Sequence, residues 1–306
     1  MKWEKIGRIF KSNGQYPWMQ SHASLPFALP INEKIVRIFF SPRDSNNNSY
    51  ISWLEINIDN PLKILRVFDQ PFLSPRGKGY FDDCGVMPSW IYPKRHGYEF
   101  LYIGWNVRNT VPFHHGIGRI NIDLKTEKIE DSIRPNGPFF DRNEDDPFYV
   151  TNPCVLKVGG VWRMWYLSGV GWEDSSNSPK AKYLVKSATS VDSNSWERDC
   201  QNTLSFQSDN EIAIARPSVY QDNNGFHMFF SHRSKTQNYR IGYAFSKDSY
   251  KWIRDNSPFQ LQPDDSGWDS EMMAYPHVFK LKNEVYMLYC GNGYSYEGFG
   301  IAKLTN

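Results

Sequence analysis

The sequence lacks the features of a membrane, secreted or nucleic-acid-binding protein. No apolar run approaches the roughly 20 residues that a membrane-spanning helix needs, and residues 1–10 carry charges without an apolar core. We therefore expect neither a membrane span nor a signal peptide. The formal net charge is only +2, with no basic block. Because nucleic-acid-binding proteins usually carry a basic patch, nucleic acid is not the expected partner.

Cysteine is also scarce, and the common nucleotide and nucleophile motifs are missing. The four cysteines, Cys84, Cys154, Cys200 and Cys290, are far apart and lack metal-ligand spacing. Reduced, mostly buried thiols in a cytoplasmic protein are the simplest interpretation. No phosphate-binding glycine loop or Gly-x-Ser-x-Gly elbow occurs. The adjacent His114 and His115 have no further ligand at a suitable spacing. The sequence therefore predicts no metal and no cofactor.

Aromatic residues, in contrast, are abundant and occur in short runs. Phe, Trp and Tyr make up 16% of the chain. Over residues 214–255, four runs rich in aromatic and β-branched residues are separated by turn-forming segments such as Asp222-Asn-Asn-Gly. This pattern is typical of four antiparallel strands joined by tight turns. One such sheet cannot bury both of its faces alone, so it needs neighbouring sheets.

The same four-strand pattern recurs along the chain. A proline marks the first run of each repeat, at a spacing of roughly 60 to 65 residues. The anchoring prolines are Pro26, Pro88, Pro153, Pro217 and Pro276. This period fits four strands with generous loops. The sequence therefore predicts one all-β domain over residues 1–306, a five-bladed β-propeller with four-stranded antiparallel blades. Its inner strands are expected to begin near residues 24, 86, 152, 216 and 275.

The two ends of the chain indicate how the ring closes. The last repeat stops after its third strand, at Leu304. The missing outer strand should carry a sequence of the Trp-x-Arg-Asp type, as at Trp196 and Trp252. Residues 3–10, which begin Trp3-Glu-Lys, look like that strand. We expect this N-terminal strand to pair into the last blade, which leaves no unprotected sheet edge.

Acidic residues precede four of the five predicted inner strands. They are Asp82 and Asp83, Asp145 and Asp146, Glu211, and Asp269 and Glu271. An acid entering an apolar strand must be solvated, paired or functional, because burial of an unpaired charge is costly. Convergent carboxylates raise one another's pKa, so a site can hold one proton donor and one ionised partner. Structural alternatives are turn formation for Asp83 and an ion pair with Arg216 for Glu211.

The repeat pattern resembles the five-bladed propeller glycoside hydrolases of families 43, 32 and 130 over essentially the whole chain. Three segments are more specific: Asp82-Asp-Cys-Gly-Val-Met-Pro-Ser, Trp162-Arg-Met-Trp-Tyr-Leu-Ser-Gly and Trp268-Asp-Ser-Glu-Met-Met-Ala-Tyr-Pro. They are similar to glycosyl-hydrolase-like proteins of bacterial surface-polysaccharide gene clusters. The resemblance implies a carbohydrate-active enzyme that cleaves or transfers a glycosidic bond, with a surface-polysaccharide precursor as a candidate substrate.

The chain departs from the pattern of those hydrolases, which carry acids on the inner strands of the first three blades. Here the first blade offers His22 and Ser24, and the third offers Thr151 and Asn152. Only Asp83 stands where the resemblance implies an acid. Catalysis has either moved around the ring or been lost or redirected. The predicted catalytic carboxylates are therefore Asp83, Glu211 and Glu271.

Five further residues are predicted to bind substrate near these acids. They are His22, Asp82, Trp105, Arg216 and Arg233. A tryptophan can stack on a sugar face, and an arginine can hold a carboxylate or phosphate. Two alternatives stay open: a non-catalytic sugar-binding propeller whose acids are paired with arginines, and a transferase or lyase acting on a nucleotide sugar.

Overall fold

The computed structural model describes residues 1–175 and 178–305, and its regular structure is almost entirely antiparallel β-sheet. The strands are β1 (Trp3–Phe10), β2 (Ser21–Pro30), β3 (Ile35–Arg43), β4 (Ser52–Asn57), β5 (Asn60–Val67), β6 (Gly85–Pro93), β7 (Tyr98–Val107), β8 (Phe113–Ile122), β9 (Val150–Val158), β10 (Val161–Glu173), β11 (Lys180–Ser190), β12 (Glu197–Leu204), β13 (Glu211–Gln221), β14 (Phe226–Ser234), β15 (Arg240–Ser246), β16 (Ile253–Asp255), β17 (Ala274–Leu281), β18 (Glu284–Cys290) and β19 (Phe299–Leu304). Two short helical turns, η1 (Asp131–Ile133) and α1 (Asn292–Ser295), complete the regular elements. None of the described helices is long and apolar enough to cross a membrane.

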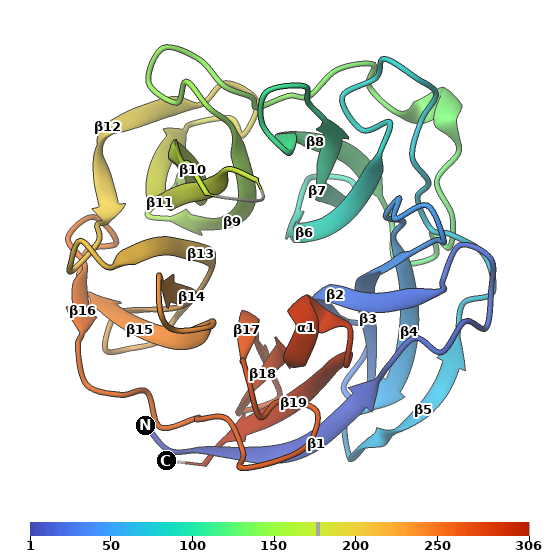
Figure 1. The fold of residues 1–306 in the computed structure, drawn as a ribbon. Coiled ribbons are helices and arrows are strands. Elements are labelled where there is room, and N and C mark those ends of the chain that lie inside the picture. The colour runs from blue at the N-terminus through green and yellow to red at the C-terminus, as the bar shows by residue number, and fades with distance from the viewer. Residues whose placement is uncertain (176–177, 306) are drawn as a thin grey trace.

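The strands form four hydrogen-bonded sheets in which neighbours in sequence are usually neighbours in space. Two sheets have four strands, β2-β3-β4-β5 and β1-β19-β18-β17, and one has three, β6-β7-β8. In the fourth, β9–β12 and β13–β16 are linked by a parallel bridge between Tyr183 and Ala213. Figure 1 shows the sheets around a central axis, with β2, β6, β9, β13 and β17 innermost. These strands contact one another in that order, and β17 contacts β2.

The expected pairing of the two chain ends is confirmed. β1 runs antiparallel to β19, from Trp3 opposite Leu304 to Phe10 opposite Phe299. Trp3, Ile9 and Phe10 are buried, and the two termini lie side by side (Figure 1). The N-terminal strand therefore covers an edge of β19 that would otherwise be open.

The prediction of four strands in every blade is wrong for the sheet β6-β7-β8. Residues 123–149, which follow β8, contain η1 and no strand among the described elements. Pro135, Pro138 and Pro147 fall in this segment. Because proline cannot donate a backbone hydrogen bond, it interrupts a β-ladder. The segment instead packs along the sheet as an irregular strap, with Ile129 and Phe140 in the core.

A repeated turn positions the start of two outermost strands. In the first, the Asp192 carboxylate accepts the backbone N–H groups of Asn194 and Ser195 at 2.7 and 3.0 Å. Asp248 repeats this before β16. The indole N–H groups of Trp196 and Trp252 then donate to the turn backbone, each at 3.2 Å. Each tryptophan is thereby fixed two residues before an arginine of the outer strand.

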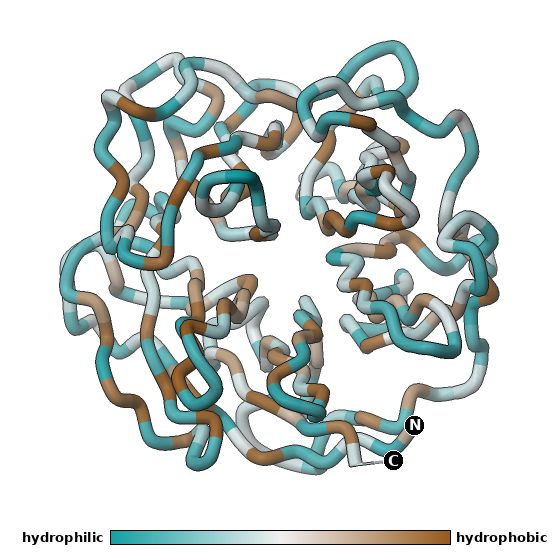
Figure 2. Tube along the Cα trace, turned by 180° about the vertical axis from the view of Figure 1, so that it is seen from behind, coloured by the Kyte–Doolittle hydropathy of each residue, from teal (hydrophilic) through white to brown (hydrophobic). Residues whose placement is uncertain are grey.

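Hydrophobic residues fill the space between adjacent sheets. Ten of the eleven residues of β13 are buried, so this innermost strand is covered on both faces. Trp165 meets Trp252 edge-on, with ring centroids 5.7 Å apart. Figure 2 shows short hydrophobic and hydrophilic stretches that alternate along the chain. Aromatic residues at alternating strand positions therefore serve mainly as core, as expected for Trp196 and Trp252, which pack against it.

Candidate functional site

Three of the aspartates that precede inner strands share one set of partners. Each is buried, each accepts a hydrogen bond from a tyrosine 20 residues later, and each pairs with a cation from the outermost strand or the strap that replaces it. The sets are Asp82 with Tyr102 and Arg134, Asp146 with Tyr166 and Arg198, and Asp269 with Tyr289 and Lys5. Because each carboxylate joins several strands of one sheet, this recurrence is structural.

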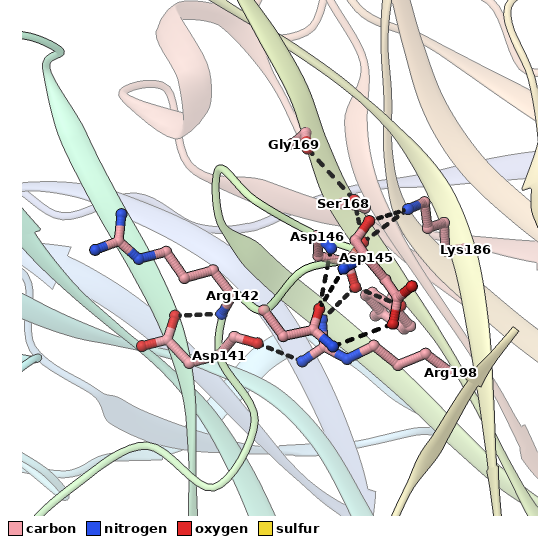
Figure 3. A network of polar contacts seen from close by, with 10 residues as sticks. Asp141, Arg142, Asp145, Asp146, Ser168, Gly169, Lys186 and Arg198 are labelled. Carbon is pink, nitrogen blue, oxygen red and sulfur yellow. Dashed lines mark hydrogen bonds and ion pairs between the residues drawn. The ribbon is translucent and has the colours of Figure 1, made fainter. Parts of the chain in front are cut away.

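Asp146 shows the arrangement in full (Figure 3). Its carboxylate accepts Ser168 Oγ–H at 2.5 Å and Tyr166 O–H at 2.8 Å from β10. It also pairs with Lys186 Nζ of β11 at 3.0 Å and with Arg198 of β12. Burial would raise the pKa of Asp146, but the hydrogen bonds from Ser168, Tyr166 and Lys186 outweigh it and lower the pKa. The group is ionised and ties three strands together.

Glu211 occupies the corresponding place at the start of β13. Arg254 of β16 holds both carboxylate oxygens, at 2.6 and 2.9 Å, and His232 Nδ1 lies 3.3 Å from Oε1. Its partner is thus Arg254 rather than the expected Arg216. Burial opposes ionisation, but the hydrogen bonds from His232 and Arg254 prevail and lower the pKa of Glu211 to about 2. At neutral pH this carboxylate therefore has no proton to donate.

The lowered pKa of Glu211 predicts that the folded protein loses stability in acid. Its folded-state pKa, about 2, lies below the ordinary 4.5, so its stabilisation is present above pH 4.5 and is lost as the pH falls toward 2. Glu211→Gln should flatten the fall in melting temperature over that interval, measured by thermal unfolding from pH 7 to pH 2. The exposed Glu144→Gln variant should keep the wild-type slope. If the melting temperature of Glu211→Gln fell with pH as steeply as that of the wild type, the ionised Glu211 would not be a source of stability.

The other predicted acids lie in different surroundings. Glu271 is exposed, and its backbone N–H donates to Asn292 Oδ1 at 2.8 Å. Asp83 is half-buried; its Oδ2 accepts the Gly79 N–H at 2.8 Å. Asp83 Oδ1 is buried without a protein hydrogen-bond partner. Of the three predicted catalytic carboxylates, Asp83 alone has an unpaired buried oxygen.

Arg216 is held by the backbone of the inner strands, and His22 lies beside a serine hydroxyl of β2. Arg216 is buried and donates to the carbonyl oxygens of Leu25, Pro26 and Pro88 at 3.1–3.4 Å. It therefore links β13 to β2 and β6 across the axis, and burial lowers its pKa to about 10. His22 is half-buried beside Ser21 Oγ, at 2.9 Å. Burial and the charge of Arg43 lower the pKa of His22 to about 4.

A cavity of about 710 Å³ is formed by residues from several inner strands and the loops beside them. This volume lies within the roughly 300–1,000 Å³ of small-molecule sites. Its walls combine aromatic and aliphatic side chains with amide, hydroxyl and basic groups, and no Asp or Glu occurs among the described residues that line it. The lining includes Trp105, Phe113, Tyr149, Tyr183, Tyr239, Tyr275, Tyr294, Arg43, Arg233, Lys180, His115, Asn47, Asn152, Thr151 and Ser24.

The inner strands bulge where they meet the cavity. Leu25, Asn152, Arg216 and Tyr275, each directly before a repeated proline, have positive φ angles of 51–56°. The pairing with the neighbouring strand shifts register at each of these places. A left-handed conformation is unfavourable for a non-glycine residue, so the surrounding sheet must hold it. Three of these four residues line the cavity.

Several polar atoms at the cavity have no protein partner. They are Arg233 Nε, Tyr149 Oη, Thr151 Oγ1, Asn152 Oδ1 and His115 Nδ1, all buried. An unpaired buried polar group costs about 1–3 kcal/mol, and native proteins contain few of them. Their concentration at one cavity is typical of a site that binds a polar ligand.

The structure brings two of the eight predicted site residues to this cavity, Trp105 and Arg233. Asp82, Asp83, Glu211, Glu271, His22 and Arg216 do not line it. Sequence reasoning missed Arg43 and the tyrosines. The repeated prolines carry a signal for part of the lining, because the residue before four of the five anchoring prolines lines the cavity: Leu25, Met87, Asn152 and Tyr275.

Two Mycobacterium tuberculosis proteins are similar to the whole chain. The uncharacterized proteins MT1551 and Rv1502, from two strains, are each 34% identical over 308 residues, covering 100% of this chain and 100% of the relative. No protein-family model matches the chain.

Solved structures share the fold. One is a glycoside hydrolase, 16% identical, with a TM-score of 0.74 over 98% of this chain and 90% of that chain. Another belongs to work on the GH130 family of mannoside phosphorylases, which contains glycoside hydrolases that target β-1,2-mannosidic linkages in Candida mannan. It is 16% identical, with a TM-score of 0.71 over 99% of this chain and 94% of that chain. At these identities the likeness concerns the fold alone.

Proposed function

The chain belongs to one family with MT1551 and Rv1502 and has the fold of glycoside hydrolase-like propellers, and from this premise we propose that it is a carbohydrate-active five-bladed propeller. The cyclic contacts of β2, β6, β9, β13 and β17 support five blades in one domain over residues 1–306. The parallel bridge between β11 and β13 then joins two adjacent blades.

The observation that carries the carbohydrate-binding proposal is the cavity wall, where aromatic rings stand next to unpaired polar atoms. A pyranose has apolar faces that pack on rings such as Trp105. Its hydroxyl groups can pair with Thr151, Asn152 and Tyr149, whose buried polar atoms have no protein partner. We propose that the ligand is a sugar or sugar conjugate.

The carboxylate chemistry expected from the sequence has less support than sugar binding. Ordinary glycosidases place two carboxyl groups across the scissile bond. In the described part of the chain, Asp82, Asp146, Glu211 and Asp269 are all paired with cations, which is the pattern expected for a binding propeller. The geometry therefore best supports binding of a carbohydrate without an ordinary pair of catalytic carboxylates.

A second candidate function is cleavage or transfer of a glycosidic bond that uses Asp83. The unpaired buried Oδ1 of Asp83 favours it, together with the resemblance that implies an acid at that position. Turnover of a panel of aryl glycosides and nucleotide sugars tests it. This candidate requires turnover by the wild type and its loss in Asp83→Asn; no turnover, or an active Asp83→Asn variant, contradicts it.

We further propose a cytoplasmic surface-polysaccharide precursor as the ligand. The thiols of Cys84, Cys154 and Cys290 are free, as expected in a reducing compartment. This proposal depends on the resemblance to proteins of polysaccharide gene clusters.

Trp105→Ala should weaken sugar binding by roughly tenfold, because stacking on one aromatic ring contributes about 0.5–1.5 kcal/mol beyond the burial of area. Because Trp105 is only half-buried, the melting temperature of the Trp105→Ala variant should stay close to that of the wild type. Trp105→Phe keeps a ring but loses the hydrogen bond to Ser49 Oγ, and should retain most of the affinity. The measurement is calorimetric titration with the panel of sugars, nucleotide sugars and sugar phosphates. Unfolding of Trp105→Ala would instead make this residue part of the core.

A further inference from the structure

Two arginines of the cavity have no carboxylate partner in the described part of the chain. Arg43 is half-buried and donates from Nη1 to Asn47 Oδ1 at 2.8 Å. Arg233 is also half-buried, and its Nη1 lies 3.4 Å from Tyr294 Oη. Its guanidinium carbon stands 5.3 Å from the centroid of the Tyr239 ring. The Nε atom of Arg233 is buried and unpaired.

These two arginines differ from the buried arginines that hold the sheets. Arg134, Arg198 and Arg254 each pair with a carboxylate through buried or nearly buried side chains. These three structural arginines are therefore neutralised by carboxylates, whereas the hydrogen bonds of the structural Arg216 all go to backbone carbonyl oxygens in the described part of the chain. Arg43 and Arg233 instead donate only to neutral oxygens among the described hydrogen bonds, which leaves their charges available to a ligand.

The charged residues that line the cavity are all basic among those that the structure describes. Arg43 and Arg233 line it, Lys180 lies exposed at the same wall, and no described Asp or Glu lines it. A partly buried cation without a counterion is poorly stabilised. A guanidinium presents a planar fork of donors that matches the oxygens of phosphate and carboxylate groups. A neutral sugar supplies hydroxyl oxygens but no counterion.

We infer that the carbohydrate bound in this cavity carries a compact anionic group, a phosphate or a carboxylate, which Arg43 and Arg233 bind. This inference rests on the proposed function, since it takes the cavity as the carbohydrate site. The aromatic wall around Trp105 binds the sugar ring, and the arginines select sugars by charge.

The test compares matched ligands by calorimetric titration. The probes are a neutral hexose, the 1-phosphate of that hexose, the corresponding uronic acid, a nucleoside diphosphate hexose, and inorganic phosphate. At least one charged sugar should bind ten times more tightly than the neutral hexose. A hydrogen bond to a charged group contributes about 1.5–3 kcal/mol, so Arg233→Gln and Arg43→Gln should each weaken its binding roughly 10- to 150-fold.

Three variants control for effects on folding and overall charge. Arg95→Gln removes one positive charge from an exposed loop outside the cavity and should leave binding unchanged. Arg233→Lys and Arg43→Lys keep the charge but lose the planar fork, so each should bind the charged sugar with intermediate affinity. Thermal melting identifies a Gln variant that fails to fold, and the Lys variant then supplies the comparison.

Each outcome separates this inference from the proposed function. Equal affinity for neutral and charged sugars, insensitive to both arginine variants but lost in Trp105→Ala, overturns the anion and keeps the sugar site. Inorganic phosphate that binds alone, without competing with any sugar, overturns the placement of the anion on the sugar. Failure of every sugar in the panel to bind the wild-type protein overturns both.

Discussion

Deletion of residues 1–10 should abolish cooperative folding. The deletion removes β1, with the buried side chains of Trp3, Ile9 and Phe10, and the ion pair of Lys5 with the buried Asp269. Loss of a single large core side chain costs about 3–5 kcal/mol, whereas whole domains are stable by only about 5–15 kcal/mol. The truncation also exposes the edge of β19, which then becomes a template for aggregation.

Circular dichroism and size-exclusion chromatography measure this result, and a peptide tests its cause. A synthetic peptide of residues 1–12, added in excess, should restore folding by mass action, because it binds only the folded state. The same peptide with Trp3→Ala should restore it poorly, since Trp3 packs edge-on against Phe229 with ring centroids 5.4 Å apart. A truncated protein that melts cooperatively within a few degrees of the full chain would contradict this account of ring closure.

Asp146→Ala should lower the free energy of unfolding by about 3–5 kcal/mol. The substitution leaves Lys186 and Arg198, which are largely buried, without their carboxylate, and breaking a buried ion pair by removing one partner has a cost of this size. Two further donors, Ser168 and Tyr166, also lose their acceptor. Urea denaturation measures the change.

The neighbouring Asp145 supplies a matched control. Its side chain is exposed and accepts only from Asn143, at 3.2 Å, among the described hydrogen bonds. Asp145→Ala should therefore change the free energy of unfolding by no more than about 0.5 kcal/mol. If the two substitutions changed the free energy of unfolding equally, the contacts of Asp146 with β10, β11 and β12 would not stabilise the fold. Sugar binding by the folded fraction of Asp146→Ala should persist, because Asp146 does not line the cavity.

The recurrence of acids along the chain has a simpler cause than catalysis. Three of these carboxylates, Asp146, Glu211 and Asp269, each pair with the basic residue two positions after a tryptophan at or directly before the start of an outermost strand, and so link that strand to the start of an innermost one. The tryptophans Trp3, Trp196 and Trp252 mark these basic residues in the sequence. A pairing that recurs at the start of several inner strands is more simply explained by the stability of the fold, whereas a catalytic group needs to occur only once.

Local sequence patterns were sufficient to predict most of the strands, their repeat and the pairing of the chain ends, although the fourth strand predicted after β8 is absent from the described elements. Alternation of apolar and polar residues and local turn chemistry are short-range properties, and Trp3-Glu-Lys matches the outer strands at Trp196 and Trp252 closely enough to show where β1 pairs. The repeated prolines likewise mark bulges of the inner strands, because four of the five directly follow a residue with a positive φ angle.

Which charges meet and which residues line the cavity could be learned only from the folded arrangement of the chain. Asp82 pairs with Arg134, 52 positions away, and Asp269 with Lys5, 264 positions away. The cavity wall likewise draws Arg43, Arg233 and Tyr294 from three different sheets or their connections. Nothing local distinguishes an acid that meets an arginine from one that faces a ligand, because the free energy of a buried charge depends on the atoms that the whole fold places around it.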